Sequence, residues 1–444
     1  MVFFLPFSGH ALTSQTTRNA IQGSAPYLTF DGGRTRAVDA NGLLGIMLSN
    51  GTTYTPSTNS SSSSRPIVLP VEGQSFADIR MFVPTNTNSV ALSSLIGPPN
   101  NYWGDDDGDA GVTATGRLSL SIVDKNNQSV SRNSVLTICN APYRIKLSST
   151  NGTLSTRYGF PNRSTFSARS VNYYVNPKAE PVVCFARPNT FHDYSEQNGP
   201  SSIWDPANGF IPQSTDPSLY GRNFPTTGLN GLYFDLLISG VSQPLFWSSY
   251  PSYVPPGGIT VTMSRSTATS VRVTLTGPHA TISEHNSFSP SPISKPTLPQ
   301  TFELVGRDSN GTPVVKYGFT LKQWFVNRGN VIEYNYSRAL SWCNSIGYRL
   351  PKVKDLTNAS RDFYGNPAPG ATPASPYSYY QRRIGSGFFT EWGKMDDYSG
   401  VGFDDTHGYW TSDPYRSYQF VVGSYYGNPY WSSDYYYYGL CSHP

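Results

Sequence analysis

Three aspartates in one tight turn are the first residues of this sequence whose chemistry is distinctive. Asp105, Asp107 and Asp109 alternate around Gly108 in the segment WGDDDGDAG. Calcium prefers several hard oxygen ligands at once, so this cluster is a candidate structural calcium site. The twelve-residue EF-hand spacing with its closing glutamate is absent, and a solvated acidic turn is the alternative interpretation. We expect no other cofactor.

The four cysteines are the second group with chemical potential. Cys139, Cys184, Cys343 and Cys441 contain no CxxC pair, which argues against a zinc site or thioredoxin-like chemistry. An even number of widely spaced cysteines is typical of structural disulfides in an oxidising compartment. Three connectivities are open, of which Cys139–Cys184 with Cys343–Cys441 is the simplest; four buried free thiols are the alternative.

Motifs that would indicate catalysis or nucleic-acid binding are missing from the sequence. A GxSxG elbow, a Walker loop, an HExxH helix and a Cys–His arrangement are all absent, so we expect a protein that is not an enzyme. The net charge of +4 is spread over 444 residues without a Lys/Arg run, which disfavours nucleic-acid binding.

Aromatic side chains are concentrated near the C-terminus, in the segment YYGNPYWSSDYYYY at 425–438. Tyr and Trp offer large, stiff contact areas with a polar tip, and protein interfaces are enriched in them. The alternative is that these rings belong to the core, as we expect for Trp342 and Trp410. The candidate receptor-binding residues are Tyr425, Tyr426, Tyr430, Trp431, Tyr435 and Tyr437, with Arg382 and Arg383 at the rim.

The elements that must position these residues are mostly strands. Charged residues make up only 14% of the chain, and short runs with period-two alternation recur from residue 25 to 285. Ile259–Met263 and Val271–Leu275 predict a hairpin. Later, one helical face contains Tyr336, Ala339, Leu340, Cys343 and Ile346, with Asn335 or Ser337 as its cap and Gly347 just past its end.

The sequence pattern divides the chain into four parts. Residues 1–24 are interpreted as the remnant of a signal peptide and leader, because residues 2–7 are apolar and a small-x-small site follows; an ordinary apolar N-terminal strand is the alternative. Residues 25–285 predict antiparallel β-sandwiches, in one unit or in two subdomains split near 150–170. Residues 286–300 are rich in Pro and Ser and predict a linker, and residues 301–444 predict an α+β domain.

Several short motifs of the last part resemble the C-terminal lectin-like adhesion domain of the intimin/invasin adhesins. The motifs are WC at 342–343, GYRLP at 347–351, EWG at 391–393, YWTSD at 409–413 and the final Cys441. Upstream, WGDDDGD, PVVCFARP and SVRVTLTG are similar to a segment of large enterobacterial surface adhesins. The resemblance implies a mainly β fold, with a β-sandwich region before a C-type-lectin-like domain, and it implies the Cys343–Cys441 bridge.

The function that the resemblance implies is adhesion. We expect an exported protein at the bacterial cell surface or outside the cell, whose lectin-like domain binds a receptor on a host or neighbouring cell. The EPN, QPD and WND motifs of calcium-dependent sugar-binding lectins are absent, which favours a protein receptor over a glycan. A carbohydrate-binding module and an enzyme related to the formylglycine-generating fold are the alternatives. No stretch of 18 apolar residues predicts a transmembrane helix.

Overall fold

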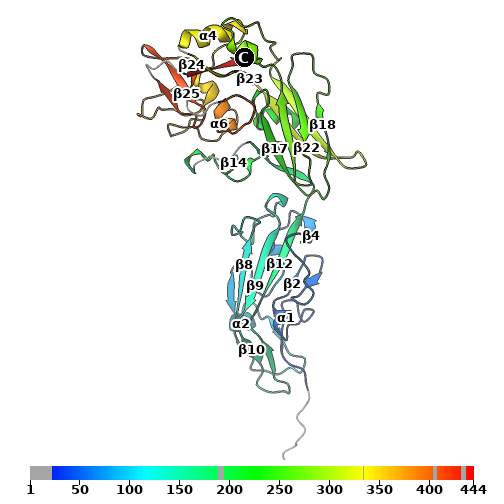
Figure 1. Cartoon of the computed structure of the whole chain (residues 1–444). Helices are drawn as coiled ribbons and strands as arrows, with labels where there is room; N and C mark the ends of the chain where they lie inside the picture. Colours follow the sequence, from blue (N-terminus) through cyan, green and yellow to red (C-terminus); the bar gives the residue numbers. More distant parts are fainter. Residues whose placement is uncertain (1–22, 189–194, 334, 404–407, 432–436) are drawn as a thin grey trace, which may run out of the picture. The chain divides into compact units, whose positions relative to one another are not determined.

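The chain forms two compact units, residues 1–179 and 180–444 (Figure 1). The computed structural model describes residues 23–188, 195–333, 335–403, 408–431 and 437–444. The predicted leader, residues 1–24, lies outside this part of the chain except for its last two residues. No helix among the described residues is long and apolar enough to cross a membrane.

The N-terminal unit is built from two main sheets around one core. In hydrogen-bonded order, the larger sheet contains β4 (Ile67–Glu72), β12 (Arg169–Lys178), β9 (Tyr143–Ser149), β8 (Arg117–Val123) and β5 (Ser89–Ala91). The smaller sheet contains β11 (Arg163–Phe166), β10 (Gly152–Ser155) and β7 (Thr113–Thr115). Alternate residues of β8, namely Leu118, Leu120 and Ile122, enter the core as their period-two spacing predicts.

Short elements complete the N-terminal unit. They are the pairs β1 (Tyr27–Leu28) with β6 (Trp103–Gly104) and β2 (Ile46–Met47) with β3 (Thr53–Tyr54), the helices α1 (Ala40–Leu43) and α2 (Leu92–Ile96), and the 3-10 turns η1 (Phe76–Asp78) and η2 (Ile138–Asn140).

The C-terminal unit begins with a second β-sandwich. One sheet runs in the order β14 (Trp204–Asp205), β15 (Gly209–Phe210), β13 (Val182–Arg187), β17 (Tyr233–Ser239), β20 (Ser270–Thr276) and β19 (Thr260–Ser264). The other contains β18 (Phe246–Tyr250), β21 (Gln300–Arg307) and β22 (Pro313–Leu321), and the 3-10 turns are η3 (Ser195–Gln197) and η4 (Pro217–Arg222). The predicted hairpin is confirmed, since Val261 of β19 pairs with Leu275 of β20.

The second part of this unit, which we call the lectin-like part after the predicted domain, is a six-stranded sheet with short helices. Its order is β16 (Thr227–Leu229), β23 (Gln323–Glu333), β27 (Tyr437–His443), β24 (Gly408–Tyr415), β25 (Tyr418–Gly423) and β26 (Pro429–Trp431). The helices are α3 (Ile282–Asn286), α4 (Tyr336–Ser345), α5 (Val353–Leu356) and α6 (Phe388–Trp392). Helix α4 confirms the predicted helical face, and the Asn335 side chain caps it by accepting a hydrogen bond from Arg338 N at 3.0 Å.

The structure places the divisions of the chain differently from the sequence pattern. The units separate after Ala179, beyond the interval 150–170. Strands β21 and β22 pair with β18 and so complete the second sandwich, although the predicted α+β domain starts at residue 301. The reason is that strands far apart in the sequence pair with one another, and the periodicity of the sequence predicts strands but not their partners.

The Pro/Ser segment at 286–300 is held against the lectin-like part rather than spanning a gap. Ile293 N donates to Ile346 O at 3.0 Å, and Tyr348 Oη donates to Ser294 O at 2.7 Å. A single buried cluster joins the second sandwich to the lectin-like sheet, including Phe234, Trp324 and Trp392. The C-terminal unit therefore folds around one core.

Candidate receptor-binding site

A disulfide bond links a helix and a strand of the lectin-like part. Cys343 of α4 is bonded to Cys441 of β27, with a Cα–Cα distance of 5.4 Å, and both residues are buried. Strand β27 lies between β23 and β24, so the bond ties helix α4 to the middle of the sheet. Cys139 and Cys184 lie in different units, and their pairing stays a prediction.

Two of the predicted contact residues are buried instead of facing solvent. Tyr437 is 7% exposed, and its ring lies edge-on to Trp410 with centroids 5.1 Å apart. Arg382 is completely buried, and its Nη1 donates to Glu391 O at 2.8 Å while its guanidinium stacks on Trp204 at 4.6 Å. Because neither side chain has surface to offer a receptor, we remove both from the candidate site.

The other predicted residues are half-buried or outside the described chain. Tyr425, Tyr426, Tyr430, Trp431 and Arg383 have intermediate exposure, whereas Tyr435 lies outside the described residues. Burial raises the pKa of the Tyr430 phenol, and its ring is 5.8 Å from that of Tyr437.

Lys394 places a positive charge beside the adjacent rings of Tyr425 and Tyr426. Its Nζ lies 4.4 Å from the ring centroid of Tyr425, and the Tyr425 and Tyr426 centroids are 4.2 Å apart. Burial lowers the pKa of Lys394, but its ion pair with Asp396, at 3.0 Å, outweighs that effect and raises it. The amine is therefore a fixed cation at neutral pH.

Three aromatic rings form a stack at the outer edge of the sheet, and we call Tyr415, Tyr418 and Trp431 the aromatic stack. The Trp431 ring is parallel to Tyr415 at 5.1 Å and to Tyr418 at 5.6 Å, with interplanar angles of 18° and 19°. Tyr418 is 39% exposed, and the other two rings are half-buried. The stack offers aromatic area beside solvent.

A tight hairpin creates the aromatic stack. Tyr415 of β24 pairs directly with Tyr418 of β25, so only Arg416 and Ser417 connect the strands. Such two-residue turns need backbone with positive φ, and Arg416 adopts φ 54°. Directly opposed side chains on an antiparallel pair lie on the same face, which brings both tyrosines beside Trp431 of β26. Arg416 lies 5.4 Å from the Tyr415 ring and adds a cation.

Sequence reasoning found only one member of the aromatic stack. Trp431 belongs to the tyrosine-rich segment, whereas Tyr415 and Tyr418 precede it and lack a repeated aromatic pattern. The signal that was available is the PYRSYQF segment at 414–420, in which two residues separate two tyrosines at a turn. Neither their exposure nor their stacking follows from the sequence.

A buried carboxylate joins helix α6 to the start of strand β16, which comes from a much earlier segment of the chain. Glu391 of α6 is completely buried, and its carboxylate accepts hydrogen bonds from Thr226 Oγ1 at 2.8 Å, Thr227 N at 3.0 Å, Thr227 Oγ1 at 2.6 Å and Gly385 N at 2.8 Å. Burial raises its pKa, and these hydrogen bonds act in the opposite direction. Glu391 lies within the EWG motif, but the motif did not predict this anchoring role.

The aspartate cluster of the N-terminal unit has the geometry of a candidate cation site. One oxygen of each of Asp105, Asp107 and Asp109 lies within 4.8 Å of the others. Burial raises the pKa of Asp109, and the charges of Asp105 and Asp107 raise it further. The three carboxylates would supply part of the oxygen shell that calcium needs, and calcium binding stays a prediction.

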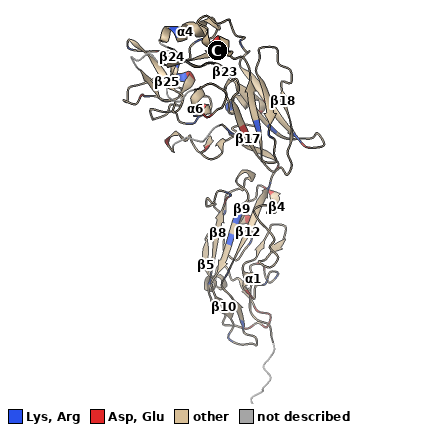
Figure 2. Cartoon of the chain, viewed as in Figure 1, with Lys and Arg blue, Asp and Glu red and all other residues tan. Residues whose placement is uncertain are grey.

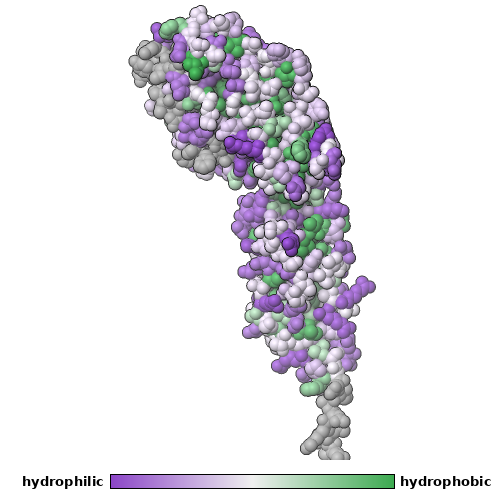
Figure 3. Space-filling model, turned by 45° about the vertical axis from the view of Figure 1, so that its right-hand side comes forward, coloured by the Kyte–Doolittle hydropathy of each residue, from purple (hydrophilic) through white to green (hydrophobic). Residues whose placement is uncertain are grey.

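Charged residues elsewhere are sparse and of mixed sign. Figure 2 shows Lys, Arg, Asp and Glu scattered among uncharged residues over both units. On the face drawn in Figure 3, apolar residues form small groups separated by polar ones. Aromatic side chains with single nearby charges, rather than a field of one sign, therefore characterise the candidate site.

Comparison with known proteins gives one informative sequence match. No known family model matches the chain. Over 131 residues it is 31% identical to the inverse autotransporter adhesin YeeJ of Escherichia coli strain K12. The chain resembles the intimin/invasin-type adhesins, as its motifs predict. The matched residues are 28% of this chain and 5% of the relative, so the chain corresponds to a small part of that protein.

Solved structures of the same group are also similar. Invasin, described as a bacterial integrin-binding protein, is 14% identical with a TM-score of 0.36, over 78% of this chain and 53% of its own. An intimin mutant from EHEC O157:H7 is 14% identical with a TM-score of 0.29, over 50% of this chain and 93% of its own. The sheet topology confirms the predicted order of a mainly β chain, with a β-sandwich region before an α+β part.

Proposed function

We propose that this chain is part of a bacterial surface adhesin and acts outside the cell. In this proposal the lectin-like part binds a protein receptor on a host or neighbouring cell. The match to an inverse autotransporter adhesin supports the adhesive role. The aromatic stack is the observation that supports this location for the contact, because a half-exposed set of large rings at a sheet edge is typical of binding surfaces.

The aromatic stack would supply binding energy without any covalent step. Stacking limits the rotation of the three rings before a partner arrives, so less conformational entropy is lost when they are covered. Arg416, which lies beside the Tyr415 ring, would pair with acidic or carbonyl groups at the edge of the contact. The buried core holds strands β24 and β25, so binding would need little rearrangement.

The test measures binding of the labelled full chain to receptor-bearing cells. We expect the double variant Tyr418→Ala with Trp431→Ala to bind at least roughly tenfold more weakly, because buried aromatic anchors dominate interface energies. Tyr253→Ala is the matched control, since Tyr253 is an exposed tyrosine of the second sandwich. Circular dichroism and the unfolding midpoint establish that each variant is folded.

Two results would contradict the proposal. Unchanged cell binding by the folded double variant would exclude the aromatic stack as the contact. Loss of binding after enzymatic removal of cell-surface glycans, with no loss after protease treatment of the cells, would replace the protein receptor by a glycan.

A further inference from the structure

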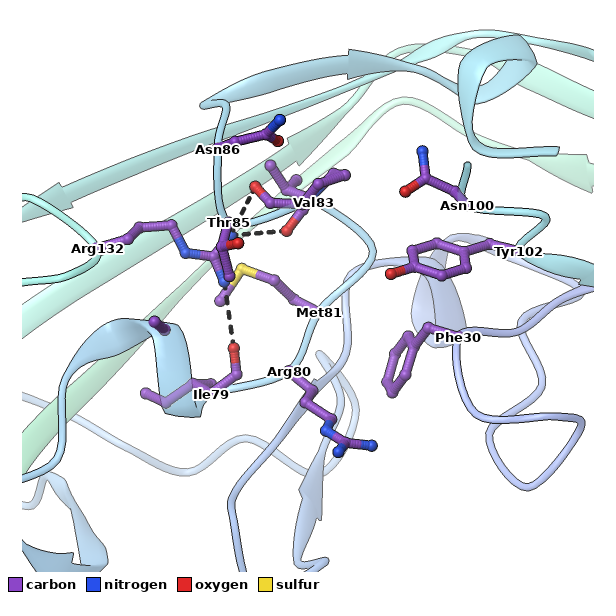
Figure 4. Close-up of a pocket in the computed structure, with 12 residues that line it drawn as sticks. Phe30, Ile79, Arg80, Met81, Val83, Thr85, Asn86, Asn100, Tyr102 and Arg132 are labelled. Carbon is purple, nitrogen blue, oxygen red and sulfur yellow. Dashed lines mark hydrogen bonds between the residues drawn. The ribbon is translucent and has the colours of Figure 1, made fainter. Parts of the chain in front are cut away.

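A pocket in the N-terminal unit lies outside the proposed adhesive contact and is lined by arginine, aromatic and asparagine side chains. Its volume is about 640 Å³, within the range of small-ligand sites. Figure 4 shows Arg132 on one side of the pocket and the rings of Phe30 and Tyr102 on the other. The lining side chains include no acidic residue; they are Phe30, Ala77, Ile79, Arg80, Met81, Val83, Pro84, Thr85, Asn86, Asn100, Tyr102 and Arg132.

Arg132 is a buried cation without a carboxylate partner. It is 6% exposed, and it makes no ion pair in the described part of the chain. Its Nη1 donates to Val83 O at 2.7 Å and Pro84 O at 3.1 Å, and its Nη2 donates to Ile79 O at 3.3 Å. These carbonyls orient the guanidinium but do not neutralise it, and Nε, also buried, has no acceptor among the described residues.

A buried charge of this kind lacks its counter-ion. Burial lowers the pKa of Arg132, which expresses the same cost of removing the cation from water. Moving an ion out of water is costly unless an opposite charge compensates for it. A guanidinium pairs especially well with a carboxylate, because its N–H groups match the spacing of the two oxygens. Arg80, exposed at the rim, adds a second cation.

The opposite wall offers aromatic and amide groups. Phe30 and Tyr102 are half-buried, and their ring centroids lie 6.5 Å apart in an edge-to-face arrangement. Asn86 and Asn100 also line the pocket, and each amide can both donate and accept hydrogen bonds. Partly accessible rings suit the apolar face of a sugar, and amides suit its hydroxyl groups. An acidic peptide side chain would leave the rings and amides unused.

We propose that this pocket binds a carboxylate-bearing sugar residue, such as a uronate or a sialate. The sugar carboxylate would face the two arginines, its ring would lie against Phe30 or Tyr102, and its hydroxyls would meet the two asparagines. The site belongs to a different unit from the aromatic stack, so it would give the chain a second and chemically distinct contact.

The test titrates the full chain with four probes and follows binding by isothermal calorimetry and saturation-transfer NMR. The probes are sodium glucuronate, N-acetylneuraminate, neutral glucose and sodium glutamate. We expect at least one acidic sugar to bind saturably, and both glucose and glutamate to bind at least roughly tenfold more weakly, since each lacks one group of contacts. Higher salt should weaken the acidic sugar selectively.

Variants separate ligand contacts from the structural role of Arg132. Arg80→Gln, and Asn86→Ala with Asn100→Ala, leave the Arg132 hydrogen bonds to main-chain oxygens in place, and we expect each to weaken the acidic sugar on the order of tenfold. Arg132→Lys keeps the charge but loses the fork and should weaken it further. Arg65→Gln is the control, because Arg65 is an exposed arginine of the same unit outside the pocket.

Three outcomes would overturn the proposal. The first is the absence of saturable binding of both acidic sugars. The second is equal or tighter binding of glutamate, which would assign the pocket to acidic peptides. The third is unchanged sugar affinity in both the Arg80 and the asparagine variants, which would place any binding outside this pocket.

Discussion

Trp392 Nε1 donates to both the main-chain oxygen and the Oγ1 of Thr227, at 3.1 and 3.2 Å. Thr227 belongs to β16, which lies in the lectin-like sheet although it comes between strands of the second sandwich in the sequence, and Trp392 belongs to helix α6. Residues 165 positions apart in the chain thus share one buried polar contact. Glu391, next to Trp392, binds the same threonine and its neighbour Thr226.

The first prediction concerns Glu391→Gln. The amide nitrogen of Gln would meet N–H donors that now bind a carboxylate, so at least one buried donor would lose its acceptor. We expect the free energy of unfolding of the C-terminal unit to fall by about 3 kcal/mol. Urea unfolding of the full chain measures this loss. Glu196→Gln, an exposed site in the same unit, should change it little; equal effects of the two variants would contradict the anchoring role.

The second prediction concerns the bond between Cys343 and Cys441. The bond closes a loop of 98 residues, and the chain-entropy model gives roughly 4–5 kcal/mol for that length. We expect the double variant Cys343→Ala with Cys441→Ala to lower the unfolding midpoint of the C-terminal unit sharply. Ser345→Ala, at the end of the same helix, is the control. A double variant as stable as the unmodified chain would exclude a stabilising role.

The third prediction concerns pH. Burial lowers the pKa of His285 and of His443 below the usual 6.5, and nearby cations lower both further. As pH falls below 6.5, the unfolded chain therefore binds protons at these sites before the folded chain does. Their contribution to stability is complete above that pH and is lost as pH falls toward the folded-state values.

The pH effect is measured as a change in melting temperature from about pH 7.5 to about pH 5.5, a range in which few ordinary carboxyls titrate. We expect His285→Gln with His443→Gln to show a smaller decrease than the unmodified chain. His279→Gln is the control, because His279 is an exposed histidine of the same unit. A decrease of the same size in all three proteins would assign it to other groups.

The fourth prediction concerns calcium. Three carboxylates held within 4.8 Å repel one another, and a divalent cation would relieve that repulsion. We expect added Ca²⁺ to raise the unfolding midpoint of the N-terminal unit, and the triple variant with Asn at 105, 107 and 109 to abolish the increase. Glu72→Gln, an exposed site in that unit, should retain it. The same increase in the triple variant would mean that calcium binds elsewhere.

Local patterns predicted local structure well. The alternation in 117–123 and the pair of runs at 259–275 became a strand and a hairpin, and the apolar spacing around Cys343 became helix α4. These elements follow from neighbours in the sequence, because side-chain periodicity decides which face is buried.

Long-range pairing was beyond the sequence pattern. Strand β16 pairs in parallel with β23, almost a hundred residues later, and nothing in residues 227–229 announces that partner. For the same reason, the run of tyrosines did not predict that Tyr437 packs on Trp410. Nor did the sequence predict that Tyr418, on strand β25, is exposed to solvent. Composition identified the aromatic region, and tertiary packing decided which rings remain accessible.

The shared core of the C-terminal unit also limits how such proteins can diversify. A recombination event near residue 300 would exchange most of the lectin-like part but leave Thr226 and Thr227 behind. Glu391 of the incoming segment would then face hydrogen-bond donors from a different protein. A crossover near residue 180 would transfer the carboxylate together with its threonines. Chimaeras of this chain that fold should therefore inherit the second sandwich and the lectin-like part together.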